Sequence, residues 1–162
     1  MPPDPDELLQ QADALAASDG ATQSDLRRAI STAYYAVFHF CLTAAADMVC
    51  GSGSRSTPRY SLVYRSVDHK TLSGLCGQLS QTKPQNVAIM PADGLGSVAD
   101  FARVTANLQR QRILADYDPS QSFSEAEAKL TISEARQAIN WFGSSSDEQK
   151  EAFLTMLLFR QR

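Results

Sequence analysis

Three polar clusters in this sequence combine residue types that bind phosphate or exchange protons. The first contains Arg28, Thr32, Tyr35 and His39, which are separated by four, three and four residues and therefore share one face of a helix. A cation, an aromatic hydroxyl and an imidazole on one strip can bind a phosphate, and the imidazole titrates near neutral pH. The alternative is that the Tyr and His rings are buried beside a hydrophobic core and their polar tips hydrogen-bond locally.

The second cluster runs from Arg110 to Tyr117 and includes Arg112 and Asp116, four residues apart. On the surface of a helix such an ion pair contributes only about 0.3–0.5 kcal/mol. If the pair is partly buried, Arg112 can present its planar guanidinium to a phosphate while Asp116 orients it. The sequence leaves both the structural and the phosphate-binding interpretation open.

The third cluster, made of Arg65, His69 and Lys70, places three basic side chains within six residues. His69 and Lys70 begin an expected helix after Asp68, and the N-terminal end of a helix attracts anions. A solvated surface patch has the same composition. The cluster is therefore either an anion-binding surface or ordinary exposed polar surface.

Other kinds of chemistry lack their motifs. The segment Gly51–Ser54 has neither a preceding strand nor a following Lys, so it is not a phosphate-binding P-loop. Neither Gly-x-Ser-x-Gly nor His-Glu-x-x-His occurs in the chain. Two His and three scattered Cys predict neither a zinc site nor a disulfide framework. We therefore expect no metal and no cofactor.

Length and charge indicate one domain outside the membrane. The 162 residues suit a single domain, and a hydrophobic content of 43% can fill its core. The net charge of -3 argues against binding nucleic acid or anionic membrane through bulk positive charge, so any basic surface must be local. The start of the chain has no basic leader, and the most apolar stretch, residues 33–46, covers 14 residues where a membrane helix needs about 20. We expect a cytoplasmic protein.

The elements that must position these clusters are helices. Apolar residues recur at three- and four-residue intervals, and no segment shows the sustained alternation of a strand. Capping residues Thr22, Asp68, Ser124 and Ser146 begin four helices, and Gly51 and Gly143 end two. The expected helices cover about residues 6–17, 22–50, 68–79, 95–115, 124–142 and 146–159. A loop is expected over residues 51–58, the next residues are left unassigned, and residues 81–93 are expected to be irregular.

This pattern predicts an all-α, up-and-down bundle of four to five core helices over residues 5–142, followed by a C-terminal helix within residues 143–162. The last helix is very apolar, since six of the seven residues from Phe153 to Phe159 are hydrophobic. One helical face cannot hide all of them. We expect this helix to pack on the bundle or in a dimer interface.

The clusters also carry a family resemblance. The run from Ser24 to His39, the helix start at Asp68 and the run from Arg112 to Tyr117 occur in the order of the HEPN family (higher eukaryotes and prokaryotes nucleotide-binding), which the chain resembles over about residues 5–142. The resemblance implies an antiparallel helical bundle that forms a homodimer and binds RNA or a nucleotide. It further implies a toxin or defence role, a nucleotidyltransferase-like antitoxin as partner, and metal-independent attack of a ribose 2′-hydroxyl on the adjacent phosphate.

The sequence departs from the family at the catalytic motif, where an Arg and a His are separated by four to six residues. Neither His39 nor His69 has an Arg at that spacing, and Arg112 is followed by Asp116 and Tyr117 instead. The candidate catalytic residues are Arg112, Asp116 and Tyr117. The candidate phosphate-binding residues are Arg28, Tyr35, His39, Arg65, His69, Lys70 and Arg110. Three roles stay open: a ribonuclease, a non-catalytic binding module and an assembly module.

Overall fold

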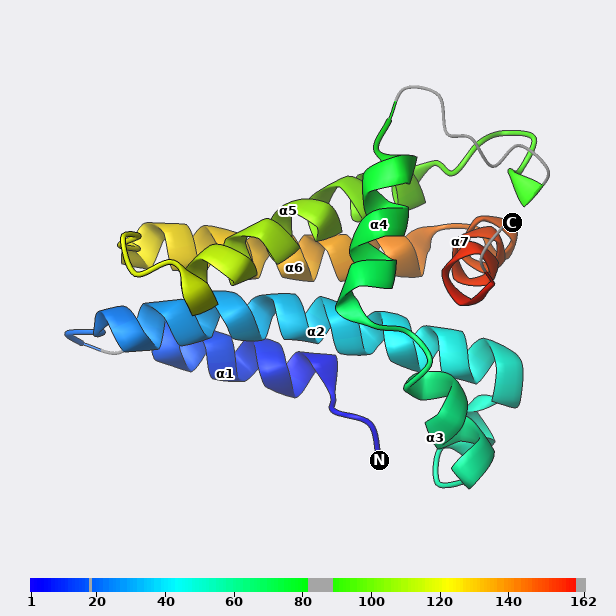
Figure 1. Cartoon of the computed structure of the whole chain (residues 1–162), viewed down its shortest axis with the longest axis horizontal. Coiled ribbons are helices and arrows are strands. Elements are labelled where there is room, and N and C mark those ends of the chain that lie inside the picture. The colour runs from blue at the N-terminus through cyan, green and yellow to red at the C-terminus, as the bar shows by residue number, and fades with distance from the viewer. Residues whose placement is uncertain (18, 82–88, 160–162) are drawn as a thin grey trace.

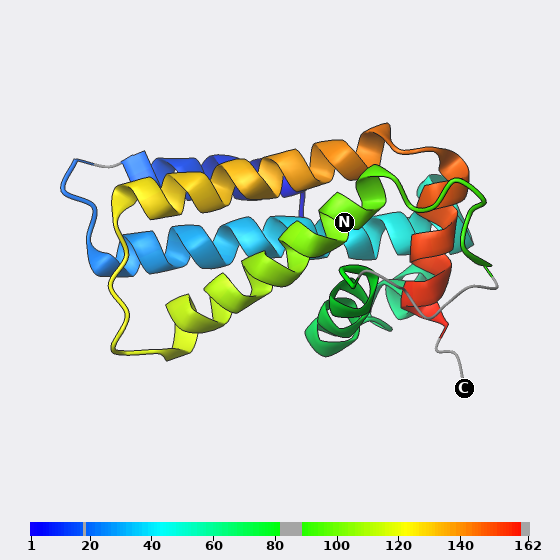
Figure 2. The same ribbon diagram turned by 90° about the horizontal axis from the view of Figure 1, so that it is seen from above.

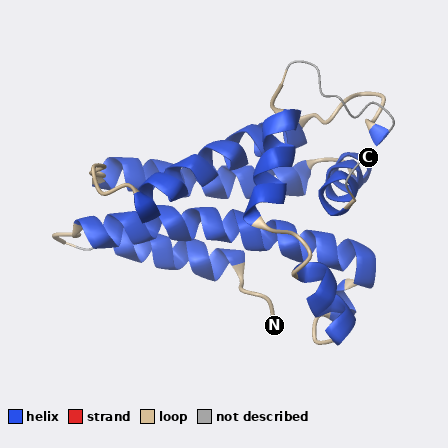
Figure 3. Ribbon diagram, viewed as in Figure 1, coloured by secondary structure: helices blue, strands red, loops and turns tan. Residues whose placement is uncertain are grey.

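The computed structural model describes residues 1–17, 19–81 and 89–159, and within these ranges the chain consists of helices joined by loops, with no strand (Figure 3). The elements are α1 (Pro5–Ala17), α2 (Gln23–Cys50), the 3-10 turn η1 (Ser52–Ser54), α3 (Pro58–Tyr64), α4 (His69–Leu79), α5 (Ser97–Tyr117), α6 (Glu125–Ser144) and α7 (Asp147–Leu158). The predicted all-α helical bundle is confirmed.

Four long helices, α1, α2, α5 and α6, lie alongside one another, and both α1–α2 and α5–α6 connect at the same end of the bundle (Figures 1 and 2). The shorter helices α3 and α7 lie towards the opposite end, and α4 packs across α5 (Figure 1). Helix α2 packs against α1, α3, α5, α6 and α7, so it is the central helix. The sequence predicts an apolar stripe along this helix from Ile30 to Met48. It is buried as far as Ala45, with Ile30, Tyr34 and Val37 fully inside the core, whereas Met48 is 37% exposed.

By length and composition alone, α2 is apolar enough to cross a membrane. The sequence-based expectation differed because it considered only the 14-residue stretch 33–46. Half of the apolar window in this helix is buried inside the bundle. The core helix of a soluble protein combines the same length and composition with such burial. The packing of α2 against five other helices is of this kind.

Local capping signals placed most helix starts correctly. Thr22 with Asp25, Ser124 with Glu127, and Ser146 with Gln149 form reciprocal capping boxes, and Asp68 caps α4. Gly51 follows the last residue of α2 with a φ of 80°, a value that suits glycine. Gly143 does not end α6, which continues to Ser144, and α5 ends two residues later than expected, so that Asp116 and Tyr117 are helical.

The sequence missed α3. Thr57 caps this helix and Pro58 occupies its first turn, but the expected loop over residues 51–58 hid both signals. Only Tyr60 is buried in α3, and Leu62 is 70% exposed. A seven-residue helix with one buried side chain has no apolar periodicity to detect. Residues 82–88 of the expected irregular stretch lie outside the described residues.

Helix α7 packs against α2, α4 and α5 of the same chain. Its residues Phe153, Leu154, Met156 and Leu157 are buried, and the Phe153 ring lies 5.4 Å from Phe101. Most of the apolar residues that suggested a dimer interface are therefore covered within one chain. Phe159, which follows the helix, is 63% exposed.

Candidate functional site

Arg112, near the end of α5, lies between two aromatic rings, and its side chain is only 13% exposed. Its guanidinium carbon is 5.3 Å from the ring centroid of Tyr35 and 5.5 Å from that of Tyr117. Nη2 donates a hydrogen bond of 2.6 Å to the Tyr35 hydroxyl. Nε lies 2.8 Å from Oδ2 of Asp116, but its N–H is not directed at that oxygen, so this contact is an ion pair without a well-formed hydrogen bond.

Asp116 joins this ion pair to α2. Its Oδ1 accepts a hydrogen bond from the hydroxyl of Ser31, a residue that is 1% exposed. The Asp116 side chain is itself 26% exposed, so the pair with Arg112 is partly buried. The sequence left open whether this pair is an exposed surface contact or a partly buried one in which Asp116 orients the guanidinium of Arg112. The observed burial fits the second interpretation.

His69, the first residue of α4, contacts the same face of α2. Its ring centroid lies 3.9 Å from that of Phe38 and 5.6 Å from that of Tyr35. Its Nδ1 is 2.9 Å from the Tyr34 hydroxyl. Burial lowers the pKa of His69, and the positive charge of Arg112 lowers it further. The Tyr35 ring thus touches both a neutral imidazole and a guanidinium that come from different helices.

His39 lies one helical turn after Tyr35, and the two rings stack with centroids 6.3 Å apart. Its Nδ1 is 2.6 Å from the hydroxyl of Tyr64, the last residue of α3. Burial lowers the pKa of His39 and raises that of Tyr64 to about 12. Among the described residues, neither His39 nor His69 has a hydrogen-bond partner at Nε2. Each imidazole is therefore fixed through one nitrogen and keeps the other for a ligand.

The structure brings together six of the ten predicted site residues, which are Tyr35, His39, His69, Arg112, Asp116 and Tyr117. The other four are exposed and lie outside this chain of contacts: Arg28, Arg65, Lys70 and Arg110. Arg65 donates through Nε to the carbonyl of Ser61, and Arg110 donates to the side chain of Asn107.

Sequence reasoning missed the residues that hold the site in place. Ser31 and Tyr34 lie on the same helical face as Arg27, one position away from the strip that contains Arg28. Arg27 donates hydrogen bonds to the carbonyls of Ala115, Asp118 and Gln121, and so fixes the end of α5 and the following loop. The sequence shows the helical spacing of Arg27, Ser31 and Tyr34. It contains no local signal that distinguishes this face of the helix from the neighbouring face that carries Arg28.

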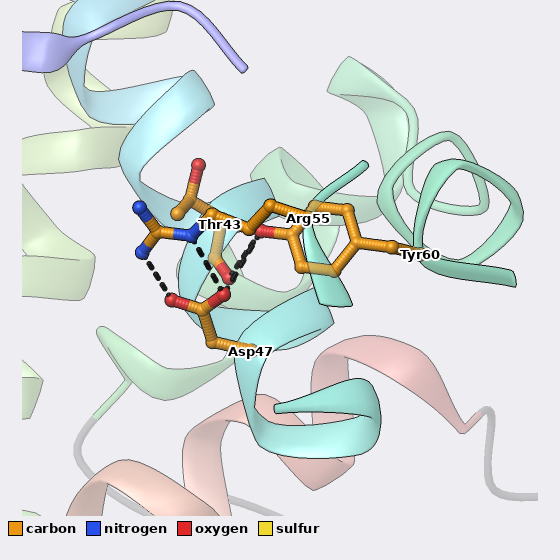
Figure 4. A network of polar contacts seen from close by, with 4 residues as sticks. All are labelled: Thr43, Asp47, Arg55 and Tyr60. Atoms are coloured by element: carbon orange, nitrogen blue, oxygen red, sulfur yellow. Dashed lines mark hydrogen bonds and ion pairs between the residues drawn. The ribbon is translucent and has the colours of Figure 1, made fainter. Parts of the chain in front are cut away.

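A second polar network lies towards the other end of α2 (Figure 4). Asp47 accepts hydrogen bonds from Arg55 at 3.1 and 2.5 Å and from the Tyr60 hydroxyl at 3.0 Å. The hydrogen bond from Arg55 keeps the pKa of Asp47 below its usual range, and burial together with Asp47 raises the pKa of Tyr60 to about 12. Because Tyr60 belongs to α3, this network fixes that helix against α2 and so positions Tyr64.

No family model matches this chain, and no match is found among curated proteins or solved structures. Within the described part of the chain, no group of three or more His, Cys, Asp or Glu side chains is placed to hold a metal ion.

Proposed function

We propose that this chain binds a phosphate group of an RNA or a nucleotide at the surface around Arg112. The observation that carries the proposal is the guanidinium of Arg112 held between the rings of Tyr35 and Tyr117, with His69 against the same Tyr35 ring. A planar guanidinium recognises phosphate through paired hydrogen bonds. Tyr117 is 69% exposed and offers a face on which a base can stack.

The partners of Arg112 leave part of its guanidinium for a ligand. Tyr35 takes one hydrogen bond from Nη2, and Asp116 lies beside Nε. Nη1 has no hydrogen-bond partner among the described residues, and it is not among the buried unpaired atoms. The side chain is thus held in one orientation with donors accessible to solvent, which is the preorganised state that favours anion binding.

The reaction we propose at this site is metal-independent cleavage of RNA. A neutral imidazole takes the proton of the ribose 2′-hydroxyl, the oxygen attacks the adjacent phosphorus, and the departing 5′-oxygen takes a proton from a water molecule as its bond to phosphorus breaks. Arg112 stabilises the negative charge on the phosphate. The lowered pKa of His69 keeps its imidazole neutral at pH 7. An Arg and a His are the pair that the HEPN resemblance requires, and here the His would come from α4.

The test uses a fluorescently labelled single-stranded RNA in the presence of EDTA, with binding and cleavage measured separately. We expect Arg112→Ala to weaken binding at least tenfold and to abolish cleavage. The matched control is Arg103→Ala, because Arg103 lies on the same helix but is 62% exposed and pairs with exposed Asp100. Wild-type protein that neither binds nor cuts RNA would refute the proposal, as would equal affinities of the two variants.

A second role is favoured by the burial of the same residues. Arg112, Asp116 and Ser31 join α5 to α2, which is the arrangement expected of a polar contact in a non-catalytic interaction module. In that case Arg112→Ala lowers the free energy of unfolding and RNA binding is absent from the wild type. RNA binding by the wild type separates this role from the first, because the buried contacts of Arg112 make Arg112→Ala less stable than Arg103→Ala in chemical denaturation in either case.

From the resemblance we also propose a homodimer and a nucleotidyltransferase-like antitoxin partner in the cytoplasm. The exposed Phe159 next to α7 offers apolar surface for a chain–chain contact. Sedimentation of the wild type should give a dimer, which Phe159→Glu weakens if that residue lies in the interface. A monomer at high protein concentration would contradict the dimer.

A further inference from the structure

We propose that Tyr64 and Arg65, at the end of α3, form a second nucleotide subsite, so that the ligand is a single-stranded RNA of at least two nucleotides. This inference rests on the proposed function, because the Arg112 surface supplies the first subsite. It adds a substrate class and two residues to that function. A continuous path of rings connects the two subsites.

The path consists of neighbouring aromatic and basic groups. From the Arg112 guanidinium it passes to the Tyr35 ring at 5.3 Å, to the His39 ring at 6.3 Å and then to the Tyr64 ring at 6.2 Å. The His39 and Tyr64 rings are nearly parallel, with an angle of 9° between their planes. Aromatic faces next to a cationic groove are how proteins bind single strands, because every base can stack on a ring.

A groove of about 250 Å³ lies at the far end of this path. It is lined by Arg55, Tyr60, Ser61, Tyr64 and Arg65, and by residues 1–3. The two arginines differ in what they offer, because Arg55 is neutralised by its ion pair with Asp47 at 2.5 Å. Arg65 is exposed, and its only hydrogen bond to a described residue uses Nε, so both of its terminal nitrogens are free to meet a phosphate.

Negative charge on the other side of Arg55 determines the direction in which a bound RNA strand runs. A larger cavity of about 630 Å³ lies there, and its lining includes Asp4, Asp6, Glu7 and Asp47. Asp47 is paired with Arg55, which also lines this cavity, and the three other carboxylates, Asp4, Asp6 and Glu7, repel a polyanion. A strand that leaves Arg112 along the ring path therefore continues into the groove beside Arg65 and stops before the acidic cavity.

The Asp47 network explains how such a subsite is held in place. Helix α3 buries only Tyr60, whose hydroxyl is 3.0 Å from Oδ1 of Asp47 (Figure 4). Tyr64 is fixed separately by its hydrogen bond to His39. Both anchors connect α3 to α2, which also carries Tyr35. The two subsites are thus preorganised against one helix, α2, to which both α3 and α5 are anchored, and this lowers the entropic cost of binding a flexible strand.

The experiment compares a mononucleotide, uridine 3′-monophosphate, with a labelled heptauridylate, both in EDTA. We expect Arg65→Ala to weaken heptauridylate binding about tenfold while mononucleotide binding stays unchanged. The slope of log affinity against log salt should fall by about 0.7, the value for one phosphate contact on a single strand. Tyr64→Ala should weaken heptauridylate binding by a similar factor through lost stacking. The matched control is Arg59→Ala, since Arg59 is also exposed on α3 but does not line the groove.

The outcomes separate this inference from the proposed function. If wild-type protein binds neither ligand, both proposals fail. If it binds both ligands through Arg112 but Arg65→Ala changes neither affinity, only the second subsite is refuted. An equal loss from Arg59→Ala and Arg65→Ala would show diffuse attraction to a basic surface and would also refute it. Thermal unfolding of Arg65→Ala and Arg59→Ala, expected to be unchanged because both side chains are exposed, confirms that the fold of these two variants is intact.

Discussion

Arg112 donates a hydrogen bond of 2.6 Å to the hydroxyl of Tyr35, 77 positions earlier in the chain. The same tyrosine ring also contacts His69, with centroids 5.6 Å apart. Tyr35 is therefore the residue at which α2, α4 and α5 meet in the site. The Tyr35 hydroxyl accepts the hydrogen bond from Arg112, and the Tyr35 ring contacts both Arg112 and His69. A substitution can therefore remove the hydrogen bond and keep the ring contacts.

Tyr35→Phe keeps the ring and removes the hydroxyl. We expect the free energy of unfolding to fall by about 1 kcal/mol, because the mostly buried guanidinium of Arg112 loses a hydrogen-bond acceptor. Tyr117→Phe is the control, since Tyr117 contacts Arg112 through its ring and is 69% exposed. Urea denaturation of both variants measures the difference. Equal stabilities would mean that the Tyr35 hydroxyl contributes nothing to the fold.

Asp116→Asn tests the partly buried ion pair. We expect a loss of about 2 kcal/mol in unfolding free energy, because Arg112 keeps its charge without the opposing carboxylate and the Ser31 hydroxyl meets a weaker acceptor. Asp100→Asn on the same helix breaks an exposed pair with Arg103 and should change stability by less than about 0.5 kcal/mol. A similar small loss from both variants would place the Arg112 pair among ordinary surface contacts.

The two histidines make stability depend on pH. Burial lowers the pKa of His39 and of His69 in the folded state, so between that value and about 6.5 the unfolded chain binds more protons than the folded one. Stability is therefore fully present above pH 6.5 and falls as the pH drops below it. We expect denaturation midpoints to decrease between pH 7.5 and 5.5. The dependence should flatten in a His39→Gln, His69→Gln double variant, and a wild-type midpoint that rises on acidification would contradict this prediction.

Gly96→Ala should destabilise the junction between α5 and α7. Gly96 has a φ of +51°, and a Cβ added there would lie 2.8 Å from Nε2 of Gln149. Gln149 caps α7 and also donates to the carbonyl of Gly94, so it cannot withdraw without losing both contacts. Gly77→Ala, inside α4 with no atom within 4 Å of the added carbon, should instead stabilise by about 0.5–1 kcal/mol. Thermal unfolding of the pair should therefore give shifts of opposite sign.

The parts of the fold that were predictable from sequence depend on local chemistry. The caps at Thr22, Asp68, Ser124 and Ser146 each involve a residue three positions away, so the sequence contains the whole interaction. Helix α3 was missed because the contacts that hold it are not local in this sense. Its anchor, the bond from Tyr60 to Asp47, spans 13 residues and has no repeating pattern.

The candidate site also combines a local contact that the sequence predicts with a long-range contact that it does not. Arg112 and Asp116 lie four residues apart on one helix, and their pairing was expected. The family motif expects a histidine shortly after Arg112 on the same helix, and Asp116 and Tyr117 stand there instead. His69 reaches the Tyr35 ring from α4, and only the path of the chain between α2 and α4 brings it there. A linear motif cannot contain that information.

Arg27 and its three carbonyl partners also have a consequence for the order of folding. Its hydrogen bonds to Ala115, Asp118 and Gln121 span 88, 91 and 94 residues, whereas a helical hydrogen bond spans four. Closing loops of this length costs chain entropy before any contact is made. The loop between α5 and α6 therefore reaches its final shape only after α2 and α5 have met, which makes it one of the last parts of the bundle to become ordered.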